Sequence, residues 1–121
     1  MTDTEAVTGD FFDRYAAALL ARDEKAVARM YAVPGLILFP GTTIPVTAQE
    51  QTEEFFAASW AQYEGVQEAQ PRIAVLAEGP ASIWADVTWS FDGDVRERFC
   101  YQLVPGHDGV HRIAVLTPLP L

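Results

Sequence analysis

Three side chains in the sequence are candidates for binding a ligand or moving a proton: His111, Arg98 and Tyr15. Histidine titrates near neutral pH, and it is therefore the usual general acid or base of a site without a cofactor. We interpret His111 as the general base, because His107 falls in a predicted turn. A histidine among apolar neighbours is also a common hydrogen-bonded core residue, so both interpretations stay open.

Arg98 is an unusual residue for the inner face of a sheet, because a buried guanidinium seldom lacks an anionic partner. It could bind the carboxylate or enolate of a ligand, or it could pair with a carboxylate of the protein at the pocket mouth. Cys100 follows two residues later and is expected to be a small buried hydrophobe. A reactive thiolate beside Arg98 is the alternative.

The region 82–117 must position these residues, and its pattern predicts three strands joined by two tight turns. Asp92-Gly93 predicts a two-residue type I′ hairpin in which Phe91 pairs with Asp94. Continuous pairing and side-chain alternation then assign an inner and an outer face. The predicted inner face carries Ile83, Ala85, Val87, Trp89, Arg98, Cys100, Gln102, His111, Ile113 and Val115. The predicted outer face carries Trp84, Asp86, Thr88, Glu97, Phe99, Tyr101, Leu103, Arg112, Ala114 and Leu116.

Apolar residues at helical spacing predict helices over 4–21 and 24–31, and a third that runs from a Thr47/Glu50 capping box, with Thr47 as the cap, to about residue 64. Short strands are predicted at 36–39 and 43–46, and a long one at 66–77, where Pro71 requires an edge or a bulge. Helices segregated from an antiparallel sheet are typical of an α+β domain. The 121 residues are enough for a single such domain spanning 1–121.

The composition argues against several classes of partner. Seventeen acidic and eight basic residues give a net charge of −9, which disfavours nucleic acid and anionic membrane surfaces. No apolar run reaches the length of about 20 residues that a membrane-spanning helix needs, and the acidic start does not resemble a signal peptide. A single cysteine cannot form an internal disulfide, and one cysteine with two histidines does not make up a zinc-type ligand cluster. We therefore expect a cytoplasmic protein without a bound metal.

Two stretches of the chain carry a resemblance to a known family: residues 13–23 with 26–31, in which Asp23 caps the second of two helices, and residues 108–116, which end in His111-Arg112-Ile113-Ala114-Val115-Leu116. They resemble the first two helices and the closing strand of the nuclear transport factor 2-like superfamily, which includes the SnoaL-like polyketide cyclases and the ketosteroid isomerases. In that closing strand Trp-Arg-Ile is common, and His111 takes the place of the tryptophan. The resemblance implies a cystatin-like cone, in which a curved antiparallel sheet wraps around three helices and Ile113 points into a pocket.

The same resemblance implies a role for Tyr15, which matches the tyrosine that donates to the oxyanion in ketosteroid isomerases. The alternative for Tyr15 is a core tyrosine with its hydroxyl at the pocket edge. Phe39 matches the position of their aspartate base, and Cys100 lies near that of their second acid, so both carboxyl groups are absent here. The segment 98–100 is similar to the Arg-x-Asp pattern of limonene-epoxide hydrolases, with the aspartate replaced by Cys100.

These observations predict a protein that binds a small, mainly apolar molecule, with proton transfer or hydration as its chemistry and no cofactor. The alternative is a non-catalytic ligand-binding or protein-interaction module. The residues expected to line the pocket are Tyr15, Phe39, Phe56, Trp60, Trp89, Arg98, Cys100, Gln102, His111 and Ile113. Because the predicted outer face is half apolar, we also expect a homodimer through that face.

Overall fold

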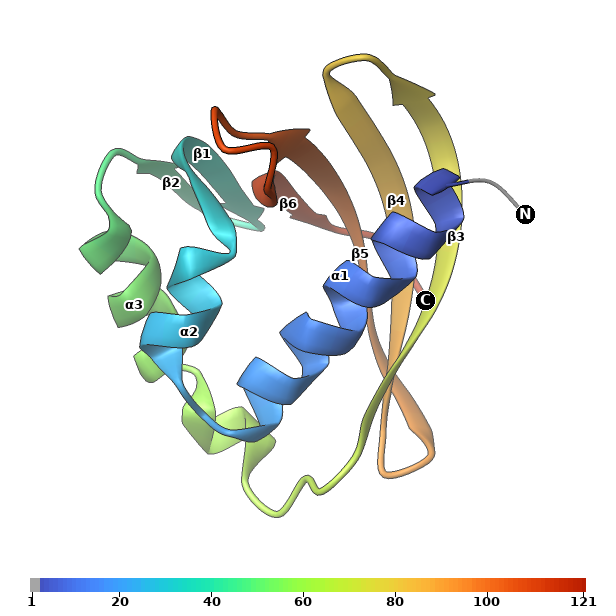
Figure 1. The fold of residues 1–121 in the computed structure, drawn as a ribbon. Helices are drawn as coiled ribbons and strands as arrows, with labels where there is room; N and C mark the ends of the chain where they lie inside the picture. The colour runs from blue at the N-terminus through green and yellow to red at the C-terminus, as the bar shows by residue number, and fades with distance from the viewer. Residues whose placement is uncertain (1–2) are drawn as a thin grey trace.

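The computed structural model describes residues 3–121, which form four helical segments and one curved sheet (Figure 1). The helical segments are α1 (Asp3–Leu20), α2 (Glu24–Arg29), α3 (Gln49–Ala57) and the short 3₁₀ helix η1 (Trp60–Tyr63). The strands are β1 (Tyr31–Phe39), β2 (Thr42–Val46), β3 (Ala69–Gly79), β4 (Ser82–Phe91), β5 (Asp94–Pro105) and β6 (His111–Pro118). No helix within residues 3–121 is long and apolar enough to cross a membrane.

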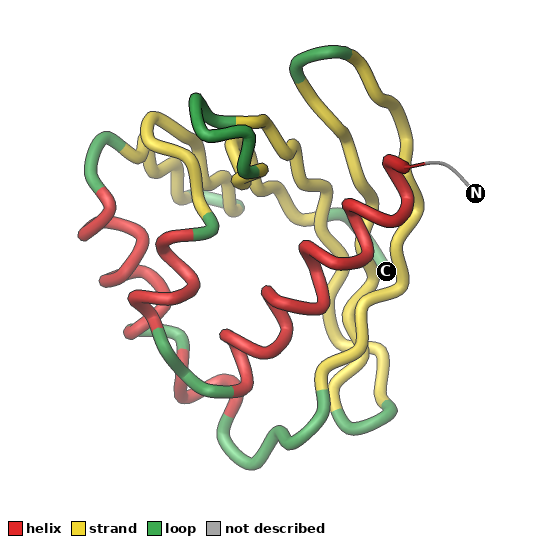
Figure 2. The backbone as a smooth tube through the Cα atoms, in the orientation of Figure 1, coloured by secondary structure: helices red, strands yellow, loops and turns green. Residues whose placement is uncertain are grey.

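The six strands form one sheet in the order β2-β1-β6-β5-β4-β3, antiparallel except where β1 meets β6. Helix α1 lies across the concave face of the sheet, and α2 and α3 lie beside it under the β1–β2 hairpin (Figures 1 and 2). The predicted α+β cone is thereby confirmed. Strand β3 is an edge strand, so Pro71 is accommodated where the missing N–H breaks few ladder bonds.

Local signals placed many element ends within two residues of their positions in the structure. Strand β1, however, begins at Tyr31 rather than at residue 36, because Tyr31 already pairs with Ile113 of β6, and α2 accordingly ends at Arg29 rather than at residue 31. Strand β3 begins at Ala69 rather than at residue 66.

The third helix shows two further shifts. Its cap lies one residue later than predicted, because the side chain of Gln51, rather than Glu50, accepts bonds from the N–H groups of Thr47 and Ala48 at 2.6 and 2.9 Å. The α-helix also ends at Ala57 rather than near residue 64. The Ser59 hydroxyl donates to the carbonyls of the preceding turn, which favours this break before η1 begins.

A β-bulge at the start of β5 determines which side chains face the core. The hairpin has the predicted positive φ angles at Asp92 and Gly93, and Phe91 pairs with Asp94 as expected. After Ser90 pairs with Val95, however, Trp89 pairs with Glu97, so one extra residue is inserted into β5. A shift of one residue turns every later side chain to the opposite face.

The faces predicted for β5 are therefore wrong. Strand β5 buries Phe99, Tyr101 and Leu103 on the concave side, and its half-buried Arg98, Cys100 and Gln102 pair across the sheet with outward-facing neighbours. A second irregularity between β5 and β6 has a similar effect. It keeps Ile113 in the core as predicted, but it buries Leu116 instead of Val115.

The core is unusually rich in aromatic side chains, contributed mainly by α1 and the concave face of the sheet. Phe12, for example, is fully buried and lies against the rings of Trp89 and Tyr101, with centroids 6.3 and 4.8 Å away. Four apolar residues expected on the outer face, Phe99, Tyr101, Leu103 and Leu116, belong to this core. The outer face is therefore more polar than the sequence indicated, and the homodimer stays a prediction.

Candidate functional site

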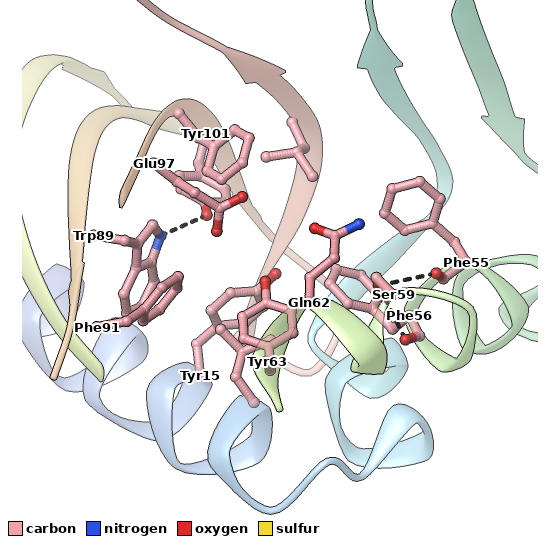
Figure 3. A pocket seen from close by; sticks show the side chains of 13 residues that line it. Tyr15, Phe55, Phe56, Ser59, Gln62, Tyr63, Trp89, Phe91, Glu97 and Tyr101 are labelled. Carbon is pink, nitrogen blue, oxygen red and sulfur yellow. Dashed lines mark hydrogen bonds between the residues drawn. The ribbon is translucent and has the colours of Figure 1, made fainter. Parts of the chain in front are cut away.

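A cavity of about 60 Å³ lies between α1, the α3–η1 segment and the concave face of the sheet (Figure 3). It is lined by Tyr15, Leu19, Phe55, Phe56, Ser59, Gln62, Tyr63, Trp89, Phe91, Glu97, Phe99, Tyr101 and Leu116. A second hollow of about 150 Å³ shares Gln62, Tyr63, Phe91 and Glu97 with it and adds Arg96. The two spaces therefore meet at the side chains of Tyr63 and Glu97.

Glu97 supplies the carboxyl group of this cavity, and the β-bulge is the reason that it faces inward opposite Trp89. Burial raises the pKa of the Glu97 carboxyl above its ordinary value, because a charged group is poorly solvated there. The hydroxyl of Tyr63 and the positive charge of Arg96 oppose this rise, and both are weaker than the effect of burial. Glu97 is thus a carboxyl group that takes up a proton more readily than an exposed one.

Two hydrogen-bonded pairs of buried aromatic residues contribute the Tyr15 and Tyr101 hydroxyls to the same cavity as this carboxyl. The hydroxyls of Tyr15 and Tyr31 lie 2.7 Å apart, and the indole N–H of Trp89 donates to the Tyr101 hydroxyl at 2.9 Å. Burial raises the pKa values of Tyr15 and Tyr101 well above the ordinary phenol value, and the nearby Glu97 charge adds to the effect. Both phenols therefore stay protonated, and the Tyr101 hydroxyl keeps its own proton to donate.

Tyr63 closes the side of the cavity that faces the second hollow. Its ring packs against Phe91 and Trp60, with centroid distances of 5.4 and 5.8 Å. Its hydroxyl interacts with the Glu97 carboxyl, and burial followed by that negative charge raises the pKa of Tyr63. Figure 3 shows Tyr15, Tyr63, Glu97 and Tyr101 turned toward the same space.

This arrangement combines a carboxyl group of raised pKa with protonated phenols in a mainly aromatic enclosure. A carboxylate in such a place can accept a proton from carbon or from water, and phenols can stabilise the negative oxygen that results. Among residues 3–121 the structure brings together no group of three or more His, Cys, Asp and Glu side chains that could hold a metal ion. The polar groups that line the cavity are a carboxyl group, hydroxyls, an indole N–H and an amide.

The structure places only part of the predicted pocket at this cavity. Tyr15, Phe56 and Trp89 line it. Phe39 packs beside it against Phe55 and Phe99, while the Trp60 indole N–H donates to Glu24 at 3.0 Å. Ile113 faces the helices and is fully buried in the core, but it does not line the cavity as expected.

Arg98, Cys100 and Gln102 do not reach the cavity, because the bulge turns them to the outer face. Arg98 donates to both carboxylate oxygens of Asp86, at 2.9 and 2.6 Å, and to the Pro120 carbonyl at 2.8 Å. Its partner is thus a carboxylate of the protein, and the expectation of an inner ligand anchor is wrong. Burial, followed by the charge of Asp86, raises the pKa of the Cys100 thiol, which disfavours the reactive thiolate.

His111 lies at a different hollow, of about 180 Å³, which it shares with Thr4, Val7 and Glu78. It pairs with Pro105 rather than with Gln102. The prediction that His111 and Arg98 reach one cavity is therefore wrong. The histidine is separated from the carboxyl and the phenols described above.

The sequence interpretation missed Glu97, Tyr63 and Tyr101 as site residues, although a signal for two of them was present. The series Phe99, Tyr101 and Leu103 is more apolar than the series Arg98, Cys100 and Gln102. Hydrophobic alternation alone would have turned the first series inward, together with Glu97. Only a bulge reconciles that choice with the Asp92-Gly93 turn.

No protein-family model matches the chain, and no curated protein matches it. Several solved structures, in contrast, are similar to the chain over most of its length. ActVI-ORFA from Streptomyces coelicolor is 15% identical with a TM-score of 0.76, covering 98% of this chain and 97% of its own. A candidate ketosteroid isomerase from Shewanella frigidimarina is 16% identical with a TM-score of 0.73, covering 93% of this chain and 94% of its own.

A third similar structure is a domain of unknown function with a cystatin-like fold from Nostoc punctiforme. It is 13% identical with a TM-score of 0.70, and the match covers 100% of this chain and 81% of that domain. Identities this low establish the fold alone. Together with the element order and the curved sheet, they confirm the predicted fold: the chain has a cystatin-like α+β fold, as the resemblance implied.

Proposed function

We propose that the chain binds a small, mainly apolar molecule carrying a carbonyl or hydroxyl oxygen, and that it moves a proton of that molecule without a cofactor. The single observation that carries the proposal is the Glu97 carboxyl, whose pKa is raised by burial and which faces the phenols of the cavity. Perturbed carboxyl groups in enclosed sites are typical of acid–base catalysts.

In the proposed reaction the Glu97 carboxylate takes a proton from the carbon next to a carbonyl group. The electron pair of that C–H bond moves onto the carbonyl oxygen and forms an enolate. The Tyr101 hydroxyl donates a hydrogen bond to that oxygen, and the Tyr15 hydroxyl does so when it accepts from Tyr31 rather than donating to it. Glu97 then returns the proton to carbon, so the cycle consumes no other reactant.

The size of the cavity limits the molecule that can react. About 60 Å³ is well below the roughly 150 Å³ of an engineered protein cavity that holds benzene, so only the reacting end fits there. The remainder would reach the neighbouring hollow of about 150 Å³ only when the Tyr63 side chain moves aside to admit the molecule. Among the structural neighbours, the Shewanella protein is named as a candidate ketosteroid isomerase, an activity of this proton-transfer type.

The alternative is a module that binds a ligand or another protein without turnover, and the small volume of the cavity favours it. The two functions differ in what happens after binding. Exchange of α-protons requires a base in the site, whereas binding requires only shape and hydrogen-bond donors.

Cyclohexanone in D₂O is a suitable test, because exchange of its α-protons is visible by proton NMR. We expect the protein to accelerate exchange, and we expect Tyr15→Phe to slow it by about 100-fold, as for the loss of one oxyanion donor. 4-Nitrophenol, whose absorbance reports its ionisation, serves as a binding probe. Binding of 4-nitrophenol without exchange would establish the module instead, and the absence of both would overturn the pocket assignment.

A further inference from the structure

Two residues that are not glycine have a positive φ within residues 3–121, and both bind the same loop. They are Arg22, with φ of 50°, and Asp92, with φ of 52°. Residues with a side chain rarely adopt this left-handed conformation, and such residues are often held by their surroundings at functional sites. The shared loop connects η1 to β3 and begins at Tyr63, the residue that faces Glu97.

Arg22 lies just after the end of α1, at the capping position that usually carries glycine. Its N–H donates to the Leu19 carbonyl at 3.0 Å, and the next N–H donates to Ala18 at 3.3 Å, the pattern of a Schellman cap. The guanidinium group then donates to the Leu20 carbonyl at 2.6 Å. It also donates to the carbonyl of Tyr63, and to that of Val66 at 3.2 Å. The side chain therefore ties the end of α1 to the first part of the loop, from Tyr63 to Val66.

Asp92 holds the other side of the same loop from the β4–β5 hairpin. Its carboxylate accepts bonds from the N–H groups of Gln67 and Glu68, at 2.9 and 2.8 Å. Its own N–H donates to the Glu68 carbonyl at 3.0 Å. This hairpin also begins β5, in which Glu97 follows the turn by a few residues. One brace thus leads to Tyr63, and the other joins the loop to the strand that carries Glu97.

We propose that Arg22 and Asp92 are positioning residues, which hold the loop against α1 and the hairpin so that Tyr63 closes the cavity over Glu97. The assignment of Glu97 as proton acceptor rests on the proposed function, whereas the bracing rests on the hydrogen bonds alone. Neither residue lines the cavity or touches the space where a ligand would react.

The charged and titratable groups around Glu97 make its protonation a sensitive reporter of this closure. They are Tyr63 from η1, Tyr15 from α1, Tyr101 from β5, and Arg96 beside it. Exclusion of water is the larger cause of the raised pKa of Glu97. Loosening the loop admits water, so the pKa of Glu97 falls toward the ordinary value.

The experiment compares Arg22→Gly and Asp92→Gly with the unmodified chain. Glycine adopts a positive φ without strain, so both variants keep the turn geometry and lose only the side-chain brace. Asp92→Asn is the matched control, because asparagine tolerates this φ and retains a side-chain oxygen acceptor. The readouts are the pKa of Glu97 from carbon-13 NMR of the carboxyl group, the rate of cyclohexanone exchange and the melting temperature.

We expect both glycine variants to lower the pKa of Glu97 and to slow exchange by about 10- to 100-fold, as misplacement of a catalytic group does. Asp92→Asn should stay close to the unmodified chain in both readouts. An unchanged Glu97 pKa in two folded glycine variants would overturn the proposal. Failure of both to fold would also overturn it, because the side chains would then serve the whole fold. If the unmodified chain exchanges no protons, the proposed function fails, while the pKa comparison still decides the bracing.

Discussion

Two carboxyl groups lie near arginines on opposite faces of the same sheet, and their environments differ sharply. On the outer face, Asp86 accepts two hydrogen bonds from Arg98, which lowers the pKa of Asp86. On the concave face, Glu97 has Arg96 nearby, but burial outweighs that charge and raises the pKa of Glu97. The first pair has the properties of a structural ion pair, and the second carboxyl has those of an acid–base group.

One extra residue produces both environments. Without the bulge, Arg98 would lie in the core and Glu97 would face outward, as continuous pairing from the turn predicts. With the bulge, Arg98 reaches Asp86, and Glu97 enters the cavity among the phenols. Both carboxyl groups have an arginine nearby, yet their pKa values shift in opposite directions. An arginine close in the sequence therefore says little about the function of a carboxyl group, because burial and direct pairing decide how that group titrates.

The largest expected effect is on proton transfer. Glu97→Gln should slow cyclohexanone exchange by about 100- to 10,000-fold, the usual contribution of a general base. Asp86→Asn is the matched change on the outer face and should leave the exchange rate nearly unaltered. Rates of deuterium incorporation by NMR measure both. Equal rates for the two variants would remove the functional distinction between the carboxyl groups.

The same two substitutions should shift thermal stability in opposite directions. Ionised Asp86 stabilises the fold above its ordinary pKa of 3.8, and this contribution is lost as the pH falls through the lowered folded-state value. Glu97 has a raised folded-state pKa, so stability is lost as the pH rises from its ordinary 4.5 through that value.

At neutral pH, Asp86→Asn should therefore lower the melting temperature and Glu97→Gln should raise it, each by a few degrees. Melting curves between pH 3 and pH 8 measure the effect. Both differences should shrink at the acidic end. A melting temperature that drops at neutral pH in the Glu97 variant would contradict the desolvated carboxyl.

A smaller change is expected from Tyr63→Phe. The Tyr63 hydroxyl lowers the pKa of Glu97, and its removal leaves the ring in place to exclude water. The pKa of Glu97 should therefore rise, and the acidic limb of the pH–rate profile should move to higher pH. Carbon-13 NMR of the carboxyl group measures the first effect. A fall in the pKa would mean that the ring had moved and admitted water.

The smallest effect is expected on the outer face, where we propose that two chains meet as a homodimer. Trp84 is half-buried there and lies opposite Gln102, although several apolar residues expected beside it belong to the core. Trp84→Glu should place a charge in that contact and weaken association. Sedimentation or light scattering at micromolar concentration measures the mass. A monomeric unmodified chain would rule the dimer out.

Several features of the fold follow from the sequence because they depend on a few neighbouring residues. The Asp92-Gly93 turn requires two positive φ angles, and both are found. Asp23 accepts the N–H of Ala26 at 3.0 Å and begins α2. The apolar spacing of α1 and the alternation of β4 likewise determined which of their side chains are buried.

The candidate site depends on contacts between distant segments, and these only the tertiary structure decided. Packing of Phe99, Tyr101 and Leu103 against the core requires the bulge, since the uninterrupted register would have buried Arg98 instead. Glu97 owes its raised pKa to burial, with Tyr63 from η1, far along the chain, as a neighbour. The local pattern of a strand divides its side chains into two alternating sets. Which set faces inward is decided by the free energy of the whole core, because burying a charged residue such as Arg98 is costly.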